Sequence, residues 1–318
     1  MSDRELKTLG VILGAVVLLY LATLVLGRGD GGSEVDPESP MAALLESLSA
    51  EGLRAVELSG PTLDEPVRLE RSGATWTANG HVADSANVAR LLDALDGAEL
   101  GDLASVNPSN HRRMGVAADS TAVMVLVADG GADTLFLGAP ASGFGTVFAR
   151  VPDDDRVYLI RGELRAPATR PLDQWRSRRV LTLDTAAVAS LVLTREGDRM
   201  ELVRTDSTWS LDGVAAERSA VGQILGELVA FQAQGFSELE APPEGPPSRT
   251  VLAADASGAV LAHVRVWDPE AGGDGSVLVL ADGEVTEPGT VYTLATWRRD
   301  RLVPTREQLT PAPTSEGG

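Results

Sequence analysis

The chain of 318 residues contains no cysteine, and its only lysine is Lys7. The lack of cysteine excludes disulfides, cysteine–zinc sites, thiolate catalysis and the acylated cysteine of a lipoprotein. With no lysine after residue 7, a folded domain of this chain has no Schiff-base lysine, no lysine-activated serine and no P-loop lysine. Aromatic residues make up only 4% of the chain, so each large ring is a candidate core anchor.

Positive charge is scarce as well. The chain has 27 Lys and Arg against 46 Asp and Glu, which gives a net charge of −19. Binding to nucleic acid or to an anionic lipid surface needs a basic patch, so we expect neither as a partner. The length exceeds what one small core needs and suits two domains.

Motifs for common catalytic chemistry are missing. The sequence has no G-x-S-x-G elbow and no H-E-x-x-H motif, and its three histidines do not pair at metal-ligand spacing. We therefore expect no catalytic residue, no cofactor site and no metal site, and we predict that the protein is not an enzyme. His111 is either a general base or a surface loop residue. The acidic loops at 153–155 and 268–274 are either weak calcium sites or solvated turns, because neither has the spacing of a dedicated calcium loop.

The longest apolar run covers residues 9–27 and contains no charge. As a helix it would be about 28 Å long, enough to cross the hydrocarbon core of a bilayer. Arg4 and Lys7 precede it, which favours a cytoplasmic N-terminus (residues 1–8) and an extracytoplasmic location for the rest of the chain. A cleaved signal peptide is the alternative, but the run is long for one. We therefore predict a single-pass protein of the cell membrane. Residues 28–51 read as a flexible linker, with a short helix at 41–48.

One stretch of sequence occurs twice without a gap, at residues 75–95 and 208–228. Each copy reads as a strand with a tryptophan, a glycine turn and a helix. The apolar positions of the first helix recur at the spacing of one helix face: Val88, Leu91, Leu92 and Leu95. The aligned tryptophans, Trp76 and Trp209, are either a ligand-stacking platform or equivalent structural anchors, and the second reading is favoured.

Short β-type runs divided by Gly and Asp turns accompany each copy and indicate antiparallel sheets. The predicted fold class is α+β: a transmembrane helix followed by two tandem, homologous α+β domains, each with an antiparallel sheet and one amphipathic helix. The predicted limits are 52–184 for the first domain, 185–304 for the second and 305–318 for a disordered tail. A polar stretch in the first domain, residues 107–120, is replaced in the second by the proline-rich residues 241–247.

Arginines cluster after two tryptophans, and we align Trp175-Arg176 with Trp297-Arg298 across a connection that is shorter in the second domain. These arginines are candidate interaction residues for a carboxylate or phosphate of a partner. The alternative is that they pair with the chain's own acids. The candidates are Arg176, Arg178, Arg179, Arg298, Arg299 and Arg301.

The order of these motifs resembles a known bacterial family. An N-terminal apolar helix precedes W-x-x-x-G, an acid and V-x-x-L-L-x-x-L, followed by Arg112-Arg113-Met114-Gly115-Val116, then Val157 to Ile160, and then Val180 to Asp184. The pattern from about Val56 to Phe236 is similar to the family called domain of unknown function 4340. The resemblance implies association with ABC-type export systems and carries over no catalytic residues.

Three functions remain open at this level. We expect a membrane-anchored extracytoplasmic accessory protein that binds a membrane-protein partner such as a transporter subunit. The first alternative is an envelope ligand-binding module with a groove between the two repeats, and a less favoured one is an Asp/Glu-dependent envelope hydrolase.

Overall fold

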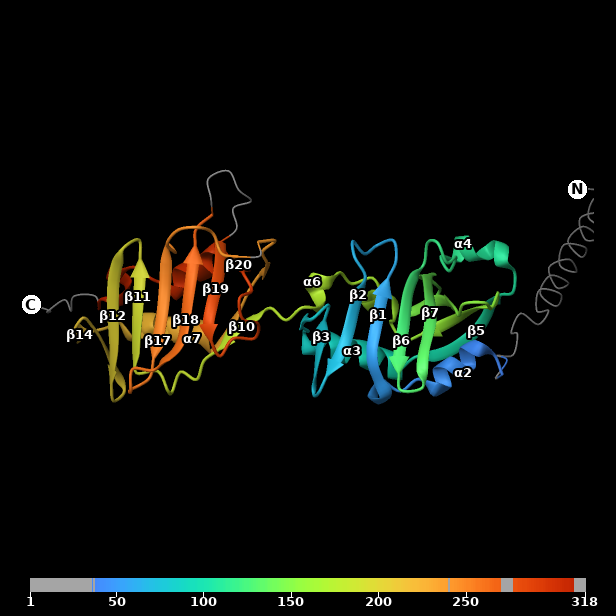
Figure 1. The fold of residues 1–318 in the computed structure, drawn as a ribbon, viewed down its shortest axis with the longest axis horizontal. Coiled ribbons are helices and arrows are strands. Elements are labelled where there is room, and N and C mark those ends of the chain that lie inside the picture. Colours follow the sequence, from blue (N-terminus) through green and yellow to red (C-terminus); the bar gives the residue numbers. More distant parts are fainter. Residues whose placement is uncertain (1–35, 37, 240, 270–276, 312–318) are drawn as a thin grey trace, which may run out of the picture. The chain divides into compact units, whose positions relative to one another are not determined.

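In the computed structural model, the described residues are 36, 38–239, 241–269 and 277–311. They fold as two compact units, and their strands form two nine-stranded sheets and one two-stranded sheet (Figure 1). None of the helices in this part of the chain is long and apolar enough to cross a membrane. The predicted membrane span, residues 9–27, and the predicted cytoplasmic residues 1–8 lie outside the described ranges.

The first sheet has the strand order β4-β3-β2-β1-β6-β7-β8-β9-β5. Its strands are β1 Leu53–Ser59, β2 Val67–Ser72, β3 Thr75–Ala78, β4 His81–Val82, β5 Glu99–Ser105, β6 Ala122–Ala128, β7 Gly131–Pro140, β8 Thr146–Arg150 and β9 Val157–Arg161. The helices of this half of the chain are α2 Pro40–Ser47, α3 Ser85–Asp96, α4 His111–Met114, α5 Arg165–Ala168 and α6 Leu172–Trp175, with 3-10 turns at η1 Ala50–Gly52 and η2 Pro108–Asn110.

The second sheet has the order β14-β13-β12-β11-β17-β18-β19-β20-β16, which repeats the first strand for strand. Its strands are β11 Ser190–Arg195, β12 Asp198–Thr205, β13 Thr208–Leu211, β14 Val214–Ala215, β16 Gly235–Phe236, β17 Arg249–Ala254, β18 Val260–Trp267, β19 Val277–Gly283 and β20 Tyr292–Leu294. The accompanying helices are α7 Arg218–Val229, α8 Thr296–Leu302 and α9 Arg306–Leu309. Strand β10 (Arg179–Thr182) pairs separately with β15 (Ala230–Gln232).

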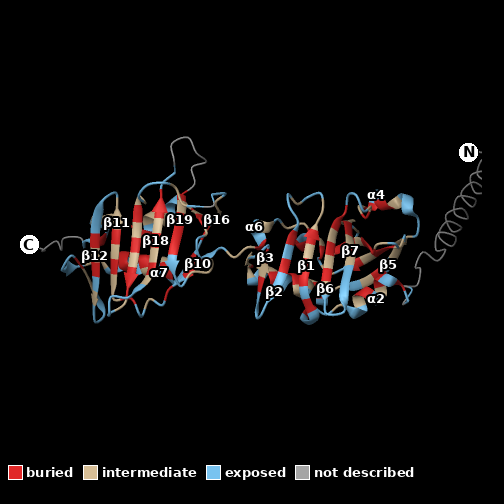
Figure 2. Cartoon of the chain, in the orientation of Figure 1, coloured by how far each residue is buried: buried red, intermediate tan, exposed pale blue. Residues whose placement is uncertain are grey.

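The α+β class is confirmed, and the reason lies in the alternation of buried and less buried positions along the strands (Figure 2). In β6 every second side chain is buried, because successive side chains of a strand point to opposite faces. One face of each sheet carries the core. In the second sheet that core includes Val266, Val279 and Tyr292 from three neighbouring strands.

The two predicted amphipathic helices are present as α3 and α7. Val88, Leu91 and Leu95 of α3 are buried, whereas Leu92 is only partly buried. Asp84 caps α3, because its Oδ1 accepts a hydrogen bond from the Asn87 N–H at 2.8 Å. In α7 the equivalent residues Val221, Ile224 and Leu228 pack into the core of the second sheet.

The short helix predicted at 41–48 is present as α2 and buries Met41 fully, so this part of the predicted linker 28–51 is packed. Two further predicted limits need correction. The first domain does not extend to 184, because β10 bonds to β15, after α7. The tail is not disordered from 305, because α9 forms with a Thr305–Gln308 capping box and buries Leu309 completely. Residues 312–318 of that predicted tail lie outside the described part of the chain.

The alignment of Trp175 with Trp297 is also wrong. The backbone N–H of Asp84 donates to the carbonyl of Trp175 at 2.7 Å, and that of the equivalent Glu217 donates to the carbonyl of Leu309 at 2.8 Å. Trp175 is therefore the counterpart of Leu309, and α6 is the counterpart of α9. The connection after the sheet is not shortened in the second half, so no gap is needed.

Candidate functional site

A groove lies on the outer face of the second sheet, opposite its core. Its cavity volume is about 1020 Å³. Strands β18, β19 and β20 form the floor, and the segment that joins β16 to β17 forms the wall. We call this segment, residues 237–239 and 241–248, the proline-rich strap.

The floor of the groove is a row of side chains at one level of the sheet. Trp267 pairs across the strands with Leu278, Leu278 pairs with Thr293, and Thr293 pairs with Gly235. Directly paired residues lie on the same face, and their strand neighbours Val266, Val279 and Tyr292 point into the core. The row therefore faces away from the core and is available to the groove.

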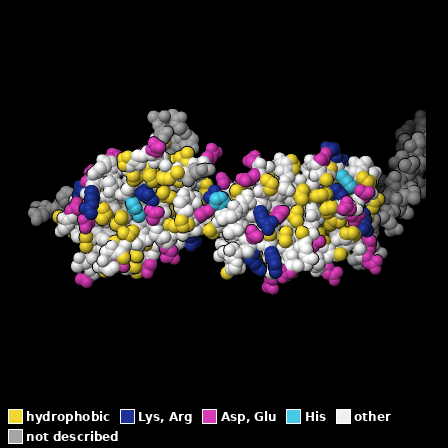
Figure 3. Space-filling model, viewed as in Figure 1, with side chains coloured by type: hydrophobic (Ala, Val, Ile, Leu, Met, Phe, Trp, Pro, Cys, Tyr) yellow, Lys and Arg dark blue, Asp and Glu magenta, His cyan; other side chains and the backbone are white. Residues whose placement is uncertain are grey.

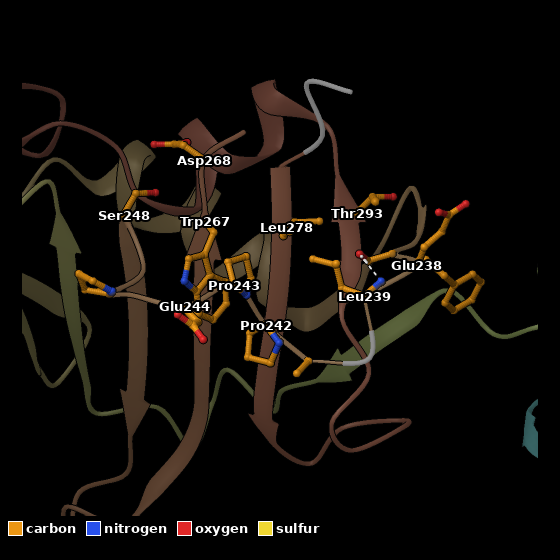
Figure 4. Close-up of a pocket in the computed structure, with 14 residues that line it drawn as sticks. Glu238, Leu239, Pro242, Pro243, Glu244, Ser248, Trp267, Asp268, Leu278 and Thr293 are labelled. Carbon is orange, nitrogen blue, oxygen red and sulfur yellow. Dashed lines mark hydrogen bonds between the residues drawn. The ribbon is translucent and has the colours of Figure 1, made fainter. Parts of the chain in front are cut away.

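Prolines and one side-chain hydrogen bond fix the position of the strap, which is the wall of the groove. Pro242, Pro243 and Pro246 line the groove, and proline restricts the backbone before binding. The indole Nε1 of Trp267 donates to the carbonyl of Gly245 at 3.3 Å. Trp267 is only 8% exposed, so it supports the strap rather than standing free. Figure 4 shows its ring beside Pro243.

Apolar surface is left open beside Trp267. Leu278 is half-buried, and Leu239 of the strap is 49% exposed. Phe236 lies at the far edge of the groove, but it pairs across the strands with Tyr292, and its ring packs against the Tyr292 ring on the core side at 5.6 Å between centroids. An aromatic and proline lining of this kind suits an apolar or extended ligand.

The carboxylate of Asp268 lies at the upper rim (Figure 4) but is already neutralised. It binds Arg249, at 3.1 Å, and Arg299. Burial alone would raise the pKa of Asp268, but hydrogen bonds from Arg299 and Ser248 and the charge of Arg249 lower this pKa below the usual aspartate value. An aspartate held ionised by two arginines is not suited to donate a proton as a general acid.

Two other acids at the groove are free of such pairing. Glu238 and Glu244 are exposed, and neither forms an ion pair with another described residue. In the view of Figure 4, Glu244 lies on the Trp267 side of the groove and Glu238 on the Thr293 side. The rim is therefore negative at both ends.

Within the described ranges, no group of three or more His, Asp or Glu is arranged to hold a metal ion. In the predicted acidic loop at 153–155, Asp154 binds Arg156 at 3.0 Å. Glu270 and Asp274 of the other acidic loop lie outside the described residues. His111 is not a surface residue, because it is 8% exposed and its Nε2 lies 2.9 Å from the carbonyl oxygen of Asp155.

The family matching this chain is described as a domain of unknown function (DUF4340), and the match covers residues 76–250. The chain belongs to the DUF4340 family. No curated protein and no solved structure matches the chain. The DUF4340 match includes the proline-rich strap but stops within β17, so Trp267, Leu278 and Thr293 lie beyond it.

Both aligned tryptophans fall inside the DUF4340 match. Trp76 on β3 is 9% exposed, and the Arg71 guanidinium lies 5.6 Å from its ring centroid. Trp209 on β13 is partly buried against the second core, with Arg204 at 5.9 Å. Each ring is thus covered by an arginine, which fits structural anchors better than an open stacking platform.

Four of the six candidate interaction arginines pair with the chain's own acids. Arg298 binds Glu227 at 2.7 Å and Arg301 approaches the same carboxylate at 3.5 Å. Arg176 stacks over Phe236 at 3.8 Å and lies 3.5 Å from Glu287. Arg299 binds Asp268 and Asp300.

Arg178 and Arg179 are exposed and make no side-chain ion pair with another described residue. Because α6 corresponds to α9 and not to α8, the predicted equivalence of the two arginine groups does not hold. On the face of the molecule shown in Figure 3, basic and acidic side chains are intermingled. Arg178 and Arg179 remain the predicted interaction residues without a described partner.

Sequence reasoning missed the groove as a site. Its floor combines residues from three strands whose alignment depends on long-range pairing. The available signal was the proline run at 241–247, which replaces a longer polar stretch at the same point of the duplicated unit.

Proposed function

We propose that this protein is a membrane-anchored extracytoplasmic accessory protein that binds a protein partner through the groove under the proline-rich strap, as an auxiliary component of an ABC-type export system. The groove carries this proposal. It is apolar at the floor, walled by prolines and open to solvent at Leu239, which favours binding over chemistry. The uncharged run at 9–27 supports the anchor, and the DUF4340 resemblance supports the link to export.

An envelope ligand-binding module is the second candidate. The cavity volume of about 1020 Å³ is close to the upper end of the range for small-molecule pockets, which is roughly 300–1,000 Å³. A small apolar ligand would then occupy the groove itself. The Asp/Glu hydrolase is less favoured, because Asp268 is ion-paired to two arginines.

The partner is tested with a photo-crosslinking amino acid at Leu239 in the full chain, in the cells that make it. The matched control carries the same amino acid at Val106, which is 63% exposed and belongs to the first half of the chain. We expect one membrane protein to be crosslinked from Leu239 and not from Val106. No protein product, or the same products from both positions, would contradict the proposal.

A further inference from the structure

The outer face that forms the groove exists in both repeats, and the first repeat shows what covers it there. Leu137, Ala149 and Tyr158 pair across β7, β8 and β9 as Val266, Val279 and Tyr292 pair in the second sheet. Gly138 follows Leu137 as Trp267 follows Val266. The surface of Gly138, Phe148 and Leu159 is therefore the counterpart of the groove floor formed by Trp267, Leu278 and Thr293.

In the first repeat this surface is filled by the chain itself. The segment joining β5 to β6, residues 106–121, contains Met114 and Val116, which form a small buried cluster against Phe148. The packing is close: a Cβ placed on Gly138 would lie 2.2 Å from the carbonyl oxygen of Met114. The end of helix α4 and the two residues after it thus place aliphatic side chains on this face.

In the second repeat the corresponding segment is the proline-rich strap, residues 237–239 and 241–248. It packs on Trp267 and leaves Leu278 and Leu239 accessible. The place that Met114 and Val116 fill in one repeat is partly filled by the Trp267 ring in the other, and the rest of it is the open groove. Arg112 and Arg113 precede Met114 in the covering segment of the first repeat, whereas the open groove has Glu238 and Glu244 at its rim.

We propose that the groove binds a short peptide segment of the protein partner, with an aliphatic side chain over Leu278 and lysine or arginine at the ends, beside Glu238 and Glu244. This inference rests on the proposed function and adds the chemistry of the bound segment. The apolar floor holds the aliphatic side chain, and the prolines reduce the ordering cost on the protein's side. The two rim acids attract the basic ends, while Asp268 contributes little because Arg249 and Arg299 neutralise it.

The test uses two end-capped nine-residue peptides of fixed sequence, measured by titration calorimetry against the full chain in detergent. Both carry Val-Met-Val at the centre, and the flanking residues are Lys and Arg in one and Glu in the other. We expect the native protein to bind the basic peptide about tenfold more tightly than the acidic one, with a preference that falls as salt rises.

A charge-reversal variant, E238K/E244K, keeps the experiment interpretable because both positions are exposed and the change spares the core. This variant is expected to prefer the acidic peptide, which also shows that it is folded. The substitution Leu278→Ser should weaken the binding of both peptides to the native protein and to the charge-reversal variant, because it removes the apolar floor.

Equal binding of both peptides by native protein and variant would overturn the inference. The inference would also be overturned if neither peptide bound. If a small apolar probe such as 1-anilinonaphthalene-8-sulfonate bound instead, the result would favour the small-ligand candidate. The proposed function fails separately: it is lost if Leu239 crosslinks no protein. If the E238K/E244K substitutions do not change the crosslinking from Leu239, the inferred basic peptide is contradicted while the proposed function stands.

Discussion

At the scale of single residues, the two repeats differ at Gly138 and its counterpart Trp267. The glycine lets the chain's own Met114 and Val116 lie against the sheet, because any side chain at 138 would occupy their space. The tryptophan instead supports the strap through its indole N–H. The difference between these two residues accompanies the difference between the closed face and the open groove.

The substitution Gly138→Ala is expected to destabilise the protein by about 2 kcal/mol or more, because the added Cβ meets backbone that cannot give way. Gly222→Ala on α7 is the matched control, since nothing lies within 4 Å of its Cβ position. That change should stabilise by about 0.5–1 kcal/mol through helix propensity. Urea unfolding of the full chain measures both, and equal effects of the two substitutions would refute the packing argument.

Arg306 makes the stability of the second unit depend on acid pH. Its hydrogen bonds lower the pKa of Asp198 and Asp212 below the ordinary value of 3.8. A carboxyl whose pKa is depressed by folding stabilises the fold above its unfolded pKa, and this contribution is lost as the pH falls through the folded pKa. We expect Arg306→Gln to leave a flatter dependence of the urea midpoint on pH below about pH 4. Parallel profiles for the native chain and the variant would contradict this.

At the scale of elements, the amphipathic helices could be read from the sequence because their periodicity is local. Val88, Leu91 and Leu95 repeat at helix spacing, and all three are buried in α3. Strand β5 could not be read in this way. It contains Gly101 and Asp102, and its pairing with β9 includes two register shifts, so it exists through tertiary pairing rather than strand propensity.

Helix α9 could not be predicted from the sequence for a similar reason. Its four residues, Arg306–Leu309, are too few to show a helical pattern, and the residues after them are polar. Its place is decided by the carbonyl of Leu309, which accepts the N–H of Glu217 at the start of α7, and by the burial of its side chain.

Ending the chain after Pro304 removes α9, and we expect a loss of at least about 3 kcal/mol in the stability of the second unit. The expected loss follows from the fully buried Leu309 and from the unpaired backbone at the start of α7. A chain ending after Pro311 is the control, because it keeps every described contact of α9. Denaturant unfolding followed by tryptophan fluorescence measures the loss, and coincident curves for the two truncations would show that α9 contributes nothing.

At the scale of the whole molecule, the duplication accounts for the architecture. Both nine-stranded sheets have the same order, strand for strand. The segments that cover the outer face differ: residues 106–121 close this face in the first repeat, and the proline-rich strap leaves a groove open in the second. A duplicated scaffold in which one copy keeps structural packing and the other binds a partner agrees with the proposed accessory function.

Membrane attachment is predicted from residues 9–27. A chain that begins at Asp36 is expected to remain in the supernatant after cell lysis and high-speed centrifugation, whereas the full chain should stay with membranes after alkaline extraction. Protease added to intact spheroplasts should degrade the bulk of the full chain if that part is extracytoplasmic. Recovery of the full chain in the soluble fraction would rule out the anchor.

The sequence by itself determined the α+β class, the tandem repeat, the two amphipathic helices and membership of DUF4340. The helices and the α+β class follow from patterns within about twenty neighbouring residues, where side-chain periodicity reports which face is buried. The repeat and the family membership follow from the order of motifs along the chain, which needs no knowledge of the fold. Tertiary structure alone decided the burial of His111 and Met114, the match of Trp175 with Leu309, and the groove. Each of these depends on which distant strands pair and in which register. A shift of one residue would turn Trp267 and Leu278 into the core, and the sequence of either strand alone does not specify that register.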